Sequence, residues 1–277
     1  MKVKKFELLL KEHFGKKYSE DFPRGFQRIG HVAVIGVKPG VRKHEKGIAG
    51  LVLKNYPHIK TVCRKGRVEG ELRKPRIKKI VGNGTVTTHK ENYCTYTLDV
   101  SKVMFAKGNL AERARIVSQV KDNETVVDMF AGIGYFSIPI AKSKNVKVVG
   151  IEKNMDSVKY LKKNILQNNV KILPILGDSL YSPLKIKADR IIMGYMPKTY
   201  RYLPSAFSLL KERGVIHYHD TFRKNELWEK PLGIIKKEAA KAGFRVERIV
   251  KKRVVKNYAP NVYHIVIDAE FKKQKNY

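Results

Sequence analysis

Cysteine, acidic residues and long apolar runs are all scarce in this chain of 277 residues. Its two cysteines, Cys63 and Cys94, form no spaced motif, which argues against a disulfide framework and a thiolate metal site. We expect no metal. No apolar stretch approaches the roughly 20 residues that span a bilayer, and the first eleven residues lack a signal-peptide pattern. We therefore expect a soluble, cytoplasmic protein without a membrane partner.

The shortage of acidic residues leaves a large positive charge. Lys and Arg total 58 against 25 Asp and Glu, a formal net charge of +33. Residues 1–80 contribute +15, and the remaining 197 residues contribute +18, so the first part is the more basic. Such an excess favours a polyanionic partner, above all nucleic acid, over a merely solvated lysine-rich surface. We expect a small basic α+β domain over residues 1–90 and a larger domain over residues 91–277.

Hydrophobic periodicity predicts the elements of both domains. In the first we expect helices over 6–13 and 48–55, and strands over 31–37, 59–63, 80–81, 85–88 and 93–100. A helix over 110–120 follows, capped by Asn109, with Leu110, Ala114, Val117 and Val120 facing inward. Strands then alternate with helices until two final strands, 246–255 and 262–271. This alternation predicts a parallel sheet covered on both faces, with the last two strands forming an antiparallel hairpin at one edge.

The most informative segment is residues 126–134, where a buried strand runs into Asp128-Met-Phe-Ala-Gly132-Ile-Gly134. Two glycines allow a tight turn into a helix whose free N–H groups face a ligand. Glu152 ends the next strand, twenty residues after Gly132, where an acid can accept hydrogen bonds from both hydroxyls of a ribose. An acid that caps a surface helix is the alternative. The pattern predicts a pocket for a nucleoside-containing cofactor.

Five strand–helix units followed by a hairpin resemble the Rossmann-like fold of class I S-adenosylmethionine-dependent transferases. The glycine pattern agrees, because Ser137 replaces the third glycine of a dinucleotide fingerprint. The resemblance implies S-adenosylmethionine as cofactor. Gly177-Asp178-Ser179 ends the third strand, where Asp178 could accept a hydrogen bond from the adenine amino group or act as a turn or helix-capping acid.

The end of the fourth strand departs from the pattern of amino-directed methyltransferases, which place Asn/Asp-Pro-Pro-Tyr there. This chain reads Gly194-Tyr-Met-Pro-Lys198, and Gly194 has no side chain to replace the missing Asn or Asp. The departure bears on which group is transferred.

Several stretches are similar to the archaeal and eukaryotic tRNA transferases that act at position 37, beside the anticodon. They are residues 64–73, 89–105, 126–139, 189–198, 214–221 and 258–264. Two branches share this architecture, the guanosine N1-methyltransferases and the wybutosine-pathway aminocarboxypropyltransferases. The first keeps Asn-Pro-Pro or Asn-Leu-Pro after the fourth strand, whereas Gly194–Lys198 and Lys107–Arg113 resemble the second.

The resemblance implies transfer of the 3-amino-3-carboxypropyl group to C7 of 4-demethylwyosine at position 37 of tRNA(Phe), with methylthioadenosine leaving. The sulfonium has three carbons open to attack, and in-line displacement takes the one that the pocket aims at the nucleophile. Attack by carbon needs little prior deprotonation, so we name no catalytic base. The alternatives are a tRNA guanosine-37 N1-methyltransferase, a non-catalytic RNA-binding protein and a nicotinamide oxidoreductase, the last disfavoured by Ser137 and the hairpin.

Residue roles follow from the resemblance. The expected cofactor-binding residues are Lys107, Arg113, Phe130, Ala131, Gly132, Gly134, Glu152, Lys153, Asp178, Ser179 and Gly194. Lys107 and Arg113 could hold the cofactor carboxylate or a phosphate, and a structural salt bridge is the alternative for Arg113. The expected substrate-binding residues are Arg64, Lys65, Arg67, Arg73, Arg76, Tyr195, Pro197 and Lys198. Tyr195 could stack on the flipped-out base or be a core aromatic residue.

The expected partner is tRNA, bound around its anticodon loop by a monomer of the protein. Basic clusters, including Lys251-Lys252-Arg253, would contact phosphates, which set affinity and carry little sequence information. His217 and His219 alternate on one face of the fifth strand and are expected to be core or sheet-end residues.

Overall fold

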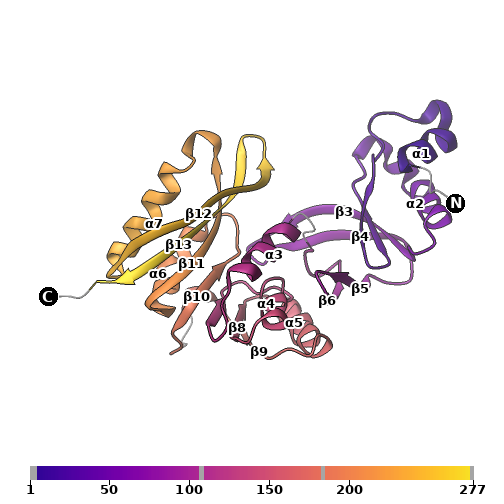
Figure 1. The fold of residues 1–277 in the computed structure, drawn as a ribbon. Helices are drawn as coiled ribbons and strands as arrows, with labels where there is room; N and C mark the ends of the chain where they lie inside the picture. The colour runs from indigo at the N-terminus through magenta and orange to yellow at the C-terminus, as the bar shows by residue number, and fades with distance from the viewer. Residues whose placement is uncertain (1–4, 106–108, 182–184, 275–277) are drawn as a thin grey trace. The chain divides into compact units, whose positions relative to one another are not determined.

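The computed structural model of the protein describes residues 5–105, 109–181 and 185–274 (Figure 1). Contacts group the chain into two compact units. The first unit comprises Met1–Glu91 with Thr95–Ala106, and the second comprises Asn92–Cys94 with Lys107–Tyr277.

The first unit contains a four-stranded sheet in the order β1–β2–β3–β4. The pair β2–β3 is parallel and the other two pairs are antiparallel. Helix α2 supplies the crossover that a parallel pair requires, and it packs beside α1 (Figure 1). The elements are α1 Phe6–Phe14, β1 Phe26–Ile29, β2 Val32–Ile35, α2 Glu45–Asn55, β3 Thr61–Glu69 and β4 Lys74–Gly82. The two helices predicted in this region are confirmed.

A separate hairpin of β5 Val86–Glu91 and β6 Cys94–Asp99 completes the first unit. Its first strand is tied to the β1–β2 turn, where the His31 N–H donates to the Thr87 hydroxyl at 3.0 Å. The Gly30 N–H likewise donates to His89 Nδ1 at 3.2 Å. The domain boundary predicted at residues 90–91 falls inside this hairpin, because most residues of β6 belong to the first unit.

The second unit contains a seven-stranded sheet in the order β12–β13–β11–β10–β7–β8–β9. Strands β11, β10, β7, β8 and β9 run parallel, whereas β13 pairs antiparallel with both β11 and β12. The predicted α/β sheet with an antiparallel hairpin at one edge is confirmed. The strands are β7 Thr125–Asp128, β8 Lys147–Glu152, β9 Ile172–Leu176, β10 Ala188–Met193, β11 Leu210–Arg223, β12 Phe244–Ala259 and β13 Val262–Lys273. The helices are α3 Leu110–Gln119, α4 Ser137–Ser143, α5 Met155–Gln167, α6 Leu203–Leu209 and α7 Glu229–Lys241.

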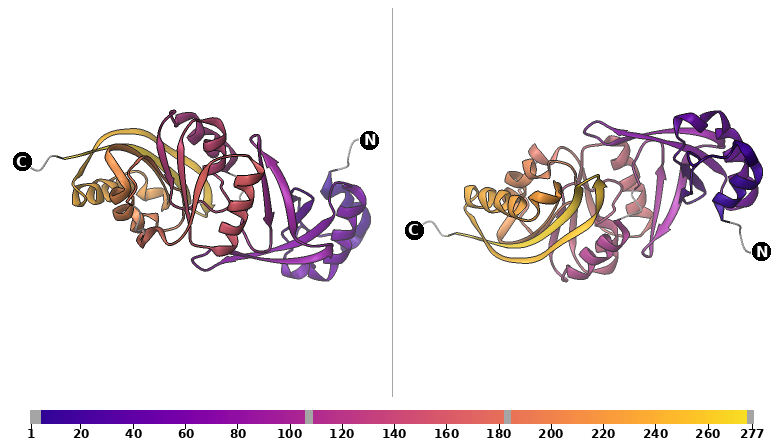
Figure 2. Two further views of the ribbon diagram at one scale, coloured as in Figure 1. Left: turned by 90° about the horizontal axis from the view of Figure 1, so that it is seen from below. Right: turned by 90° about the horizontal axis from the view of Figure 1, so that it is seen from above.

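Both faces of this sheet are covered, as Figure 2 shows. Successive residues of β10 point to opposite faces, as the period of a strand requires. Ile191 and Met193 join the core beneath α6 and α7, whereas Ile192 joins Ile116 and Ile140 in the core beneath α3 and α4. Central strands that are buried on both faces explain the continuous apolar runs of the sequence.

Helix α3 buries a different face from the predicted one. Val120 is buried as expected, but Leu110 is 42% exposed. The buried residues of the helix are Glu112, Arg113 and Ile116. The prediction was wrong because it assumed an apolar sheet face, whereas the facing strands carry charged groups.

Asn109 occupies the N-cap position of α3, as predicted, but does not cap the helix with its side chain. The Asn109 side chain makes no capping hydrogen bond, and its Oδ1 atom instead accepts from Lys256 Nζ at 2.7 Å. The start of α3 is therefore tied to β12.

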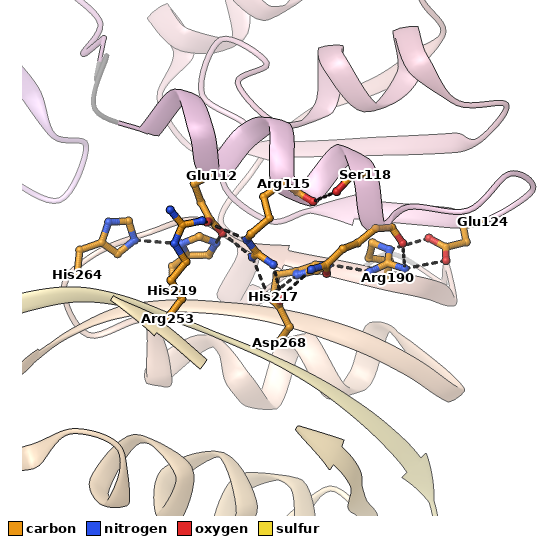
Figure 3. Close-up of polar contacts among 11 residues, drawn as sticks. Glu112, Arg115, Ser118, Glu124, Arg190, His217, His219, Arg253, His264 and Asp268 are labelled. Carbon is orange, nitrogen blue, oxygen red and sulfur yellow. Dashed lines mark hydrogen bonds and ion pairs between the residues drawn. The ribbon is translucent and has the colours of Figure 1, made fainter. Parts of the chain in front are cut away.

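A buried chain of charged groups joins α3 to the sheet (Figure 3). The Arg115 guanidinium donates to Glu112 at 2.9 Å and to Asp268 at 2.5 Å. His217 Nδ1 lies 2.6 Å from Asp268, and its Nε2 lies 2.8 Å from the guanidinium of Arg190. Because an arginine only donates, Nε2 must accept and Nδ1 must carry the proton that Asp268 accepts. His217 is therefore held as a neutral imidazole.

Two further histidines pair beside this chain. His217 and His219 are fully buried, which confirms the expectation of core histidines. His219 Nδ1 lies 3.0 Å from His264 Nε2, and within the described part of the chain the other ring nitrogens, His219 Nε2 and His264 Nδ1, have no hydrogen-bond partner. Burial lowers the pKa of all three imidazoles, that of His264 to about 3.

We expect the three buried imidazoles to lower the free energy of unfolding as the pH decreases below about 6.5, the pKa of an unperturbed histidine. In the unfolded chain these imidazoles bind protons near that pH, whereas burial keeps them neutral to a lower pH in the folded protein. Their contribution to the free energy of unfolding is therefore complete above that pH and is lost as the pH falls toward their lowered pKa values. The carboxyls of Asp128, Glu152 and Asp220, whose pKa values burial raises, act in the opposite direction. Each histidine contributes a slope of up to about 1.4 kcal/mol per pH unit. Urea unfolding between pH 7.5 and 4.5 measures it.

The matched variants are His264→Phe, which removes one buried titrating group, and His58→Gln, which alters an exposed one. The slope should fall for the first and stay unchanged for the second. A slope that is the same in His264→Phe as in the unaltered protein would contradict a neutral, buried His264.

Candidate functional site

The carboxyl ends of β7, β8, β9 and β10 lie at one edge of the second unit's sheet, because these strands are parallel. Strand β7 lies between β8 and β10, so the connections diverge on its two sides. Such a switch point is where open α/β sheets bind ligands. The predicted cofactor segments that follow these four strands therefore meet at one edge.

The glycine loop after β7 is bound directly to Glu152 at the end of β8. The Gly132 N–H donates to Glu152 Oε2 at 2.8 Å, and Oε1 accepts from the Asn154 N–H at 2.7 Å. Gly132 and Gly134 have φ of 57° and 102°, which L side chains rarely adopt. A Cβ on Gly134 would also lie 2.4 Å from the Ile138 side chain, so glycine is required there.

The Glu152 carboxylate retains acceptor capacity for a ligand. Burial raises its pKa, and the backbone N–H groups of Asn154 and Gly132 offset part of that rise. A carboxylate has about four acceptor positions, so hydroxyl groups can still be bound. Asn154 is the N-cap of α5, so Glu152 also stabilises a helix start, as the alternative interpretation held. The geometry fits a ribose at this edge.

Asp128, the acid of the glycine motif, stabilises the loop through hydrogen bonds. It is fully buried and accepts from the Ser137 hydroxyl at 2.7 Å and the Phe130 N–H at 3.2 Å. Burial raises its pKa to about 6. Ser137, which stands where a dinucleotide fold has its third glycine, thus ties the start of α4 to the end of β7. Ala131, inside the loop, is also buried, and its N–H donates to the Ile151 carbonyl at 2.9 Å.

Lys153, Asp178 and Ser179, three of the predicted cofactor-binding residues, make hydrogen bonds or ion pairs within the protein. Lys153 Nζ lies 2.8 Å from Asp178, whose other oxygen accepts from the Leu180 N–H at 3.0 Å. Burial opposes ionisation of Asp178, but the Lys153 ammonium holds its pKa below the usual value. The Ser179 hydroxyl donates to the Met129 carbonyl. Asp178 is therefore a turn acid in this structure, and its contact with adenine stays a prediction.

The segment after β10 brings Tyr195 onto Phe130 of the glycine loop. Their rings stack with centroids 5.0 Å apart and planes 23° apart, and Tyr202 meets Phe130 edge-on at 4.8 Å. Tyr195 is half-buried, so Phe130 covers one of its faces. A Cβ on Gly194 would lie 3.0 Å from the Phe136 ring, so a larger residue there would have to displace it.

Sequence reasoning missed Asp220, which holds the segment after β10 from the neighbouring strand β11. One carboxylate oxygen accepts from the Lys198 N–H at 2.9 Å, and the other accepts from the Tyr218 hydroxyl at 2.7 Å. Lys198 has a φ of 70°, a conformation that persists only where surrounding bonds determine it. Burial raises the pKa of Asp220, and these donors offset part of the rise. An acid at the carboxyl end of the strand beside β10 was the available signal.

Arg113 is buried on α3, with its guanidinium 4.6 Å from the centre of the Tyr135 ring. Tyr135 ends the glycine loop, so Arg113 contacts that loop at the edge of the sheet where the carboxyl ends of β7 to β10 lie, called the cofactor edge below. Lys107, predicted to act beside it, lies outside the described residues.

A basic hollow of about 850 Å³ lies in the first unit. The basic residues that line it are Arg42, Arg64, Lys65, Lys74, Arg76 and Lys78. Two of the arginines have acidic partners, since Arg64 lies 2.5 Å from Glu45 and Arg76 lies 2.6 Å from Glu69. The lining cations exceed these acids, so the hollow favours a polyanion.

All five residues predicted to contact RNA in the first domain come from strands β3 and β4 and their connecting turn. Arg67 is exposed on β3. Arg73, in the turn, has a φ of 50°, and its guanidinium lies 3.9 Å from the Met104 sulfur. The structure thus groups this part of the prediction on one hairpin.

Two absences complete the description of the site. In residues 5–105, 109–181 and 185–274, no cluster of three or more His, Cys, Asp or Glu side chains is arranged to hold a metal ion. Over the same residues, no helix combines the length and apolar character needed to cross a membrane.

The strand order, the glycine loop and its bond to Glu152 define a class I S-adenosylmethionine-dependent transferase fold. Residues 87–247 match the TRM5/TYW2 methyltransferase domain, and residues 6–85 match the TYW2 N-terminal domain. The chain belongs to the TRM5/TYW2 family.

Three curated relatives cover most of the chain. A tRNA(Phe) (4-demethylwyosine(37)-C(7)) aminocarboxypropyltransferase of Methanocaldococcus jannaschii is 45% identical over 75% of this chain and 84% of its own. The Pyrococcus horikoshii protein of the same name is 37% identical over 94% and 95%. The tRNA (guanine(37)-N(1))-methyltransferase Trm5b of Pyrococcus abyssi is 38% identical over 89% of this chain and 74% of its own.

Solved structures agree with these relationships. P. horikoshii TYW2 in complex with MeSAdo superposes with a TM-score of 0.85 at 34% identity, covering 97% of this chain and 100% of that one. M. jannaschii TYW2 in complex with AdoMet gives a TM-score of 0.73 at 36% identity, covering 90% and 99%. The predicted family and fold class are confirmed.

We expect the substitution Asp220→Asn to loosen the segment after β10. The amide keeps one oxygen as an acceptor but loses the negative charge, and hydrogen bonds to charged groups contribute about 1.5–3 kcal/mol, more than those to neutral groups. Native-state hydrogen exchange at the Lys198 amide should therefore accelerate by about tenfold or more.

The control is Asp122→Asn, which weakens an equivalent bond to the Asn145 N–H at an exposed site. It should leave the Lys198 amide unchanged. Unaltered exchange at Lys198 in Asp220→Asn would show that other contacts hold this segment.

Proposed function

We propose that the protein transfers the 3-amino-3-carboxypropyl group of S-adenosylmethionine to C7 of 4-demethylwyosine at position 37 of tRNA(Phe), releasing methylthioadenosine. The proposal is supported by the match of the chain, through both of its units, to archaeal aminocarboxypropyltransferases. It places the protein in the biosynthesis of wyosine derivatives.

The observation that carries this choice over N1-methylation is Gly194. The methyltransferase relatives are nearly as similar in sequence, so overall identity does not separate the two reactions. An enzyme that presents a methyl group to a ring nitrogen holds that nitrogen with a polar side chain after β10. Gly194 offers none, and the match of residues 6–85 to the TYW2 N-terminal domain favours the same branch.

Residues at the carboxyl edge would bind the cofactor, whose sulfonium supplies an electrophilic carbon. Glu152 would accept hydrogen bonds from the ribose hydroxyls, beside the Gly132 amide that it already orders. Phe130, Ala131 and Gly134 would line the pocket through backbone groups. Lys153, Asp178 and Ser179 would contact the adenine end, and Lys107 and Arg113 would hold the carboxylate.

The acceptor base would enter beside the segment after β10. Tyr195, which stacks on Phe130, would also stack on the flipped-out base. Pro197 and Lys198 would contact the nucleotide, in a conformation that Asp220 fixes. Since carbon attacks directly, alignment of the two reacting carbons accounts for most of the catalysis.

The first unit would bind the phosphates of tRNA near the anticodon loop. Arg64, Lys65, Arg67, Arg73 and Arg76 belong to the β3–β4 hairpin and surround or flank the basic hollow. We infer a cytoplasmic location from the tRNA substrate, and action as a monomer stays a prediction.

The test uses tRNA(Phe) that carries 4-demethylwyosine, with S-adenosylmethionine labelled on either the carboxyl or the methyl carbon. We expect carboxyl label to enter the RNA and methyl label to remain in the released nucleoside. The control is tRNA with guanosine at position 37, which should acquire neither label.

Methyl label in guanosine-37 would instead identify an N1-methyltransferase. Retained tRNA binding with no transfer of either label would favour a non-catalytic RNA-binding protein. Either outcome overturns the proposal.

We expect the double substitution Lys65→Glu/Arg67→Glu to weaken tRNA binding and to flatten its salt dependence. Each lost phosphate contact should reduce the slope of log K against log salt by about 0.7 to 0.9, because fewer counterions are released. Filter binding across salt concentrations measures both quantities.

The control, Lys236→Glu/Lys237→Glu, makes the same change in net charge on the exposed face of α7. If the two double variants weaken binding equally, net charge rather than the β3–β4 hairpin accounts for affinity.

A further inference from the structure

Helix α3 carries buried or partly buried charged side chains, and these contact two different parts of the second unit. Arg115 points to Asp268 on β13, as Figure 3 shows, while Arg113 packs over the ring of Tyr135. Glu112 is also buried and accepts two bonds from the same Arg115 guanidinium. Two sides of a single helix, with Arg115 on one and Arg113 on the other, therefore contact the sheet and the end of the glycine loop.

The attachment to the sheet is geometrically specific. Arg115 donates to both oxygens of Asp268, at 2.5 and 3.2 Å, and Gln119 on the next turn donates to Asp268 at 3.2 Å. Asp268 is fully buried and also accepts from His217, which Arg190 fixes in turn. A planar guanidinium bound through two nitrogens fixes orientation as well as distance.

A buried ion pair such as Arg115–Asp268 contributes little net stability to a fold. Removing two charges from water costs about as much as their attraction returns, and well-packed apolar residues often serve as well. A buried pair does, however, define the position of a helix, because shifting it would leave a charge unpaired. The Arg115–Asp268 pair therefore calls for an explanation in what the position of α3 controls.

The position of α3 controls the glycine loop through Arg113. The Arg113 guanidinium lies 4.6 Å from the Tyr135 ring centre. That ring lies against Gly132, since a Cβ on Gly132 would be 2.8 Å from it. Gly132 in turn donates its N–H to Glu152. A displacement of α3 would thus be transmitted to the hydrogen bond at the centre of the candidate cofactor site.

We propose that Arg115 and Asp268 are positioning residues for cofactor binding, which hold α3 so that Arg113 and Tyr135 press the glycine loop onto Glu152. The inference rests on the proposed function only for the identity of the ligand. Neither residue touches the cofactor edge itself, and both act through Arg113.

The test compares Asp268→Asn and Arg115→Lys with Glu124→Gln. Asp268→Asn removes the charge that fixes α3, and Arg115→Lys keeps a charge pair but loses the two-nitrogen geometry, which favours folding. Glu124 binds Arg190 at 2.7 and 2.8 Å, so Glu124→Gln weakens the far end of the same buried chain. Glutamine keeps one of the two acceptor oxygens, so Arg190 should keep its hydrogen bond to the Gln119 carbonyl of α3, at 2.8 Å. All three variants should lower stability to urea.

Two readouts separate positioning from stability. The first is hydrogen exchange of the Gly132 amide without ligand, relative to the slowest core amides, which report global unfolding. The second is affinity for S-adenosylmethionine and methylthioadenosine by calorimetry. We expect Asp268→Asn and Arg115→Lys to accelerate Gly132 exchange and to weaken both ligands about tenfold, and Glu124→Gln to change neither.

Unchanged exchange and affinity in Asp268→Asn and Arg115→Lys would overturn the inference, and so would equal changes in Glu124→Gln. If the unaltered protein bound neither ligand, the proposed function would fail instead, and the exchange comparison would still decide the role of the pair.

Discussion

The hydrogen bond from the Gly132 N–H to the Glu152 carboxylate joins the two strands that form the cofactor edge. It depends on parallel pairing, which brings the ends of β7 and β8 to the same edge of the sheet. It also depends on a positive φ at Gly132, which turns the amide toward the neighbouring strand. Two further contacts stabilise the conformation of the loop. Asp128 accepts a hydrogen bond from Ser137, and the Tyr135 ring lies against Gly132. The conformation of the loop is thus determined by contacts within the protein.

Buried charge has a second role in this fold. Asp220 orders the segment after β10, and Asp268 binds the Arg115 side chain of α3. Each carboxylate accepts several donors, so neither remains an unpaired charge in the interior. For a reaction in which carbon attacks carbon, such preorganisation matters more than a strong base. The same arrangement makes the fold sensitive to acid, because imidazoles such as His217 are held neutral.

Much of this architecture could be predicted from the sequence because it follows from the hydrophobic periodicity of short segments. The alternation of strands and helices, the terminal hairpin and the meeting of the glycine loop with Glu152 follow from patterns within short windows. The buried face of α3 could not, because Glu112 and Arg113 are buried only where the tertiary structure supplies charged or aromatic partners. Asp220 was missed for a similar reason, since its partner Lys198 is more than twenty residues away in sequence and on a different segment. The candidate ligand-binding residues could be proposed from local patterns, whereas residues such as Asp220 and Asp268, whose partners are distant in sequence, could not.

In the proposed reaction, the pocket aims the γ-methylene of the amino-acid chain, rather than the methyl group, at the acceptor base. Mass spectrometry of the nucleoside released during a single turnover with 4-demethylwyosine-containing tRNA(Phe) tests this directly. We expect methylthioadenosine in an amount equal to the modified tRNA. Release of S-adenosylhomocysteine would contradict it, because the methyl group would then have been transferred.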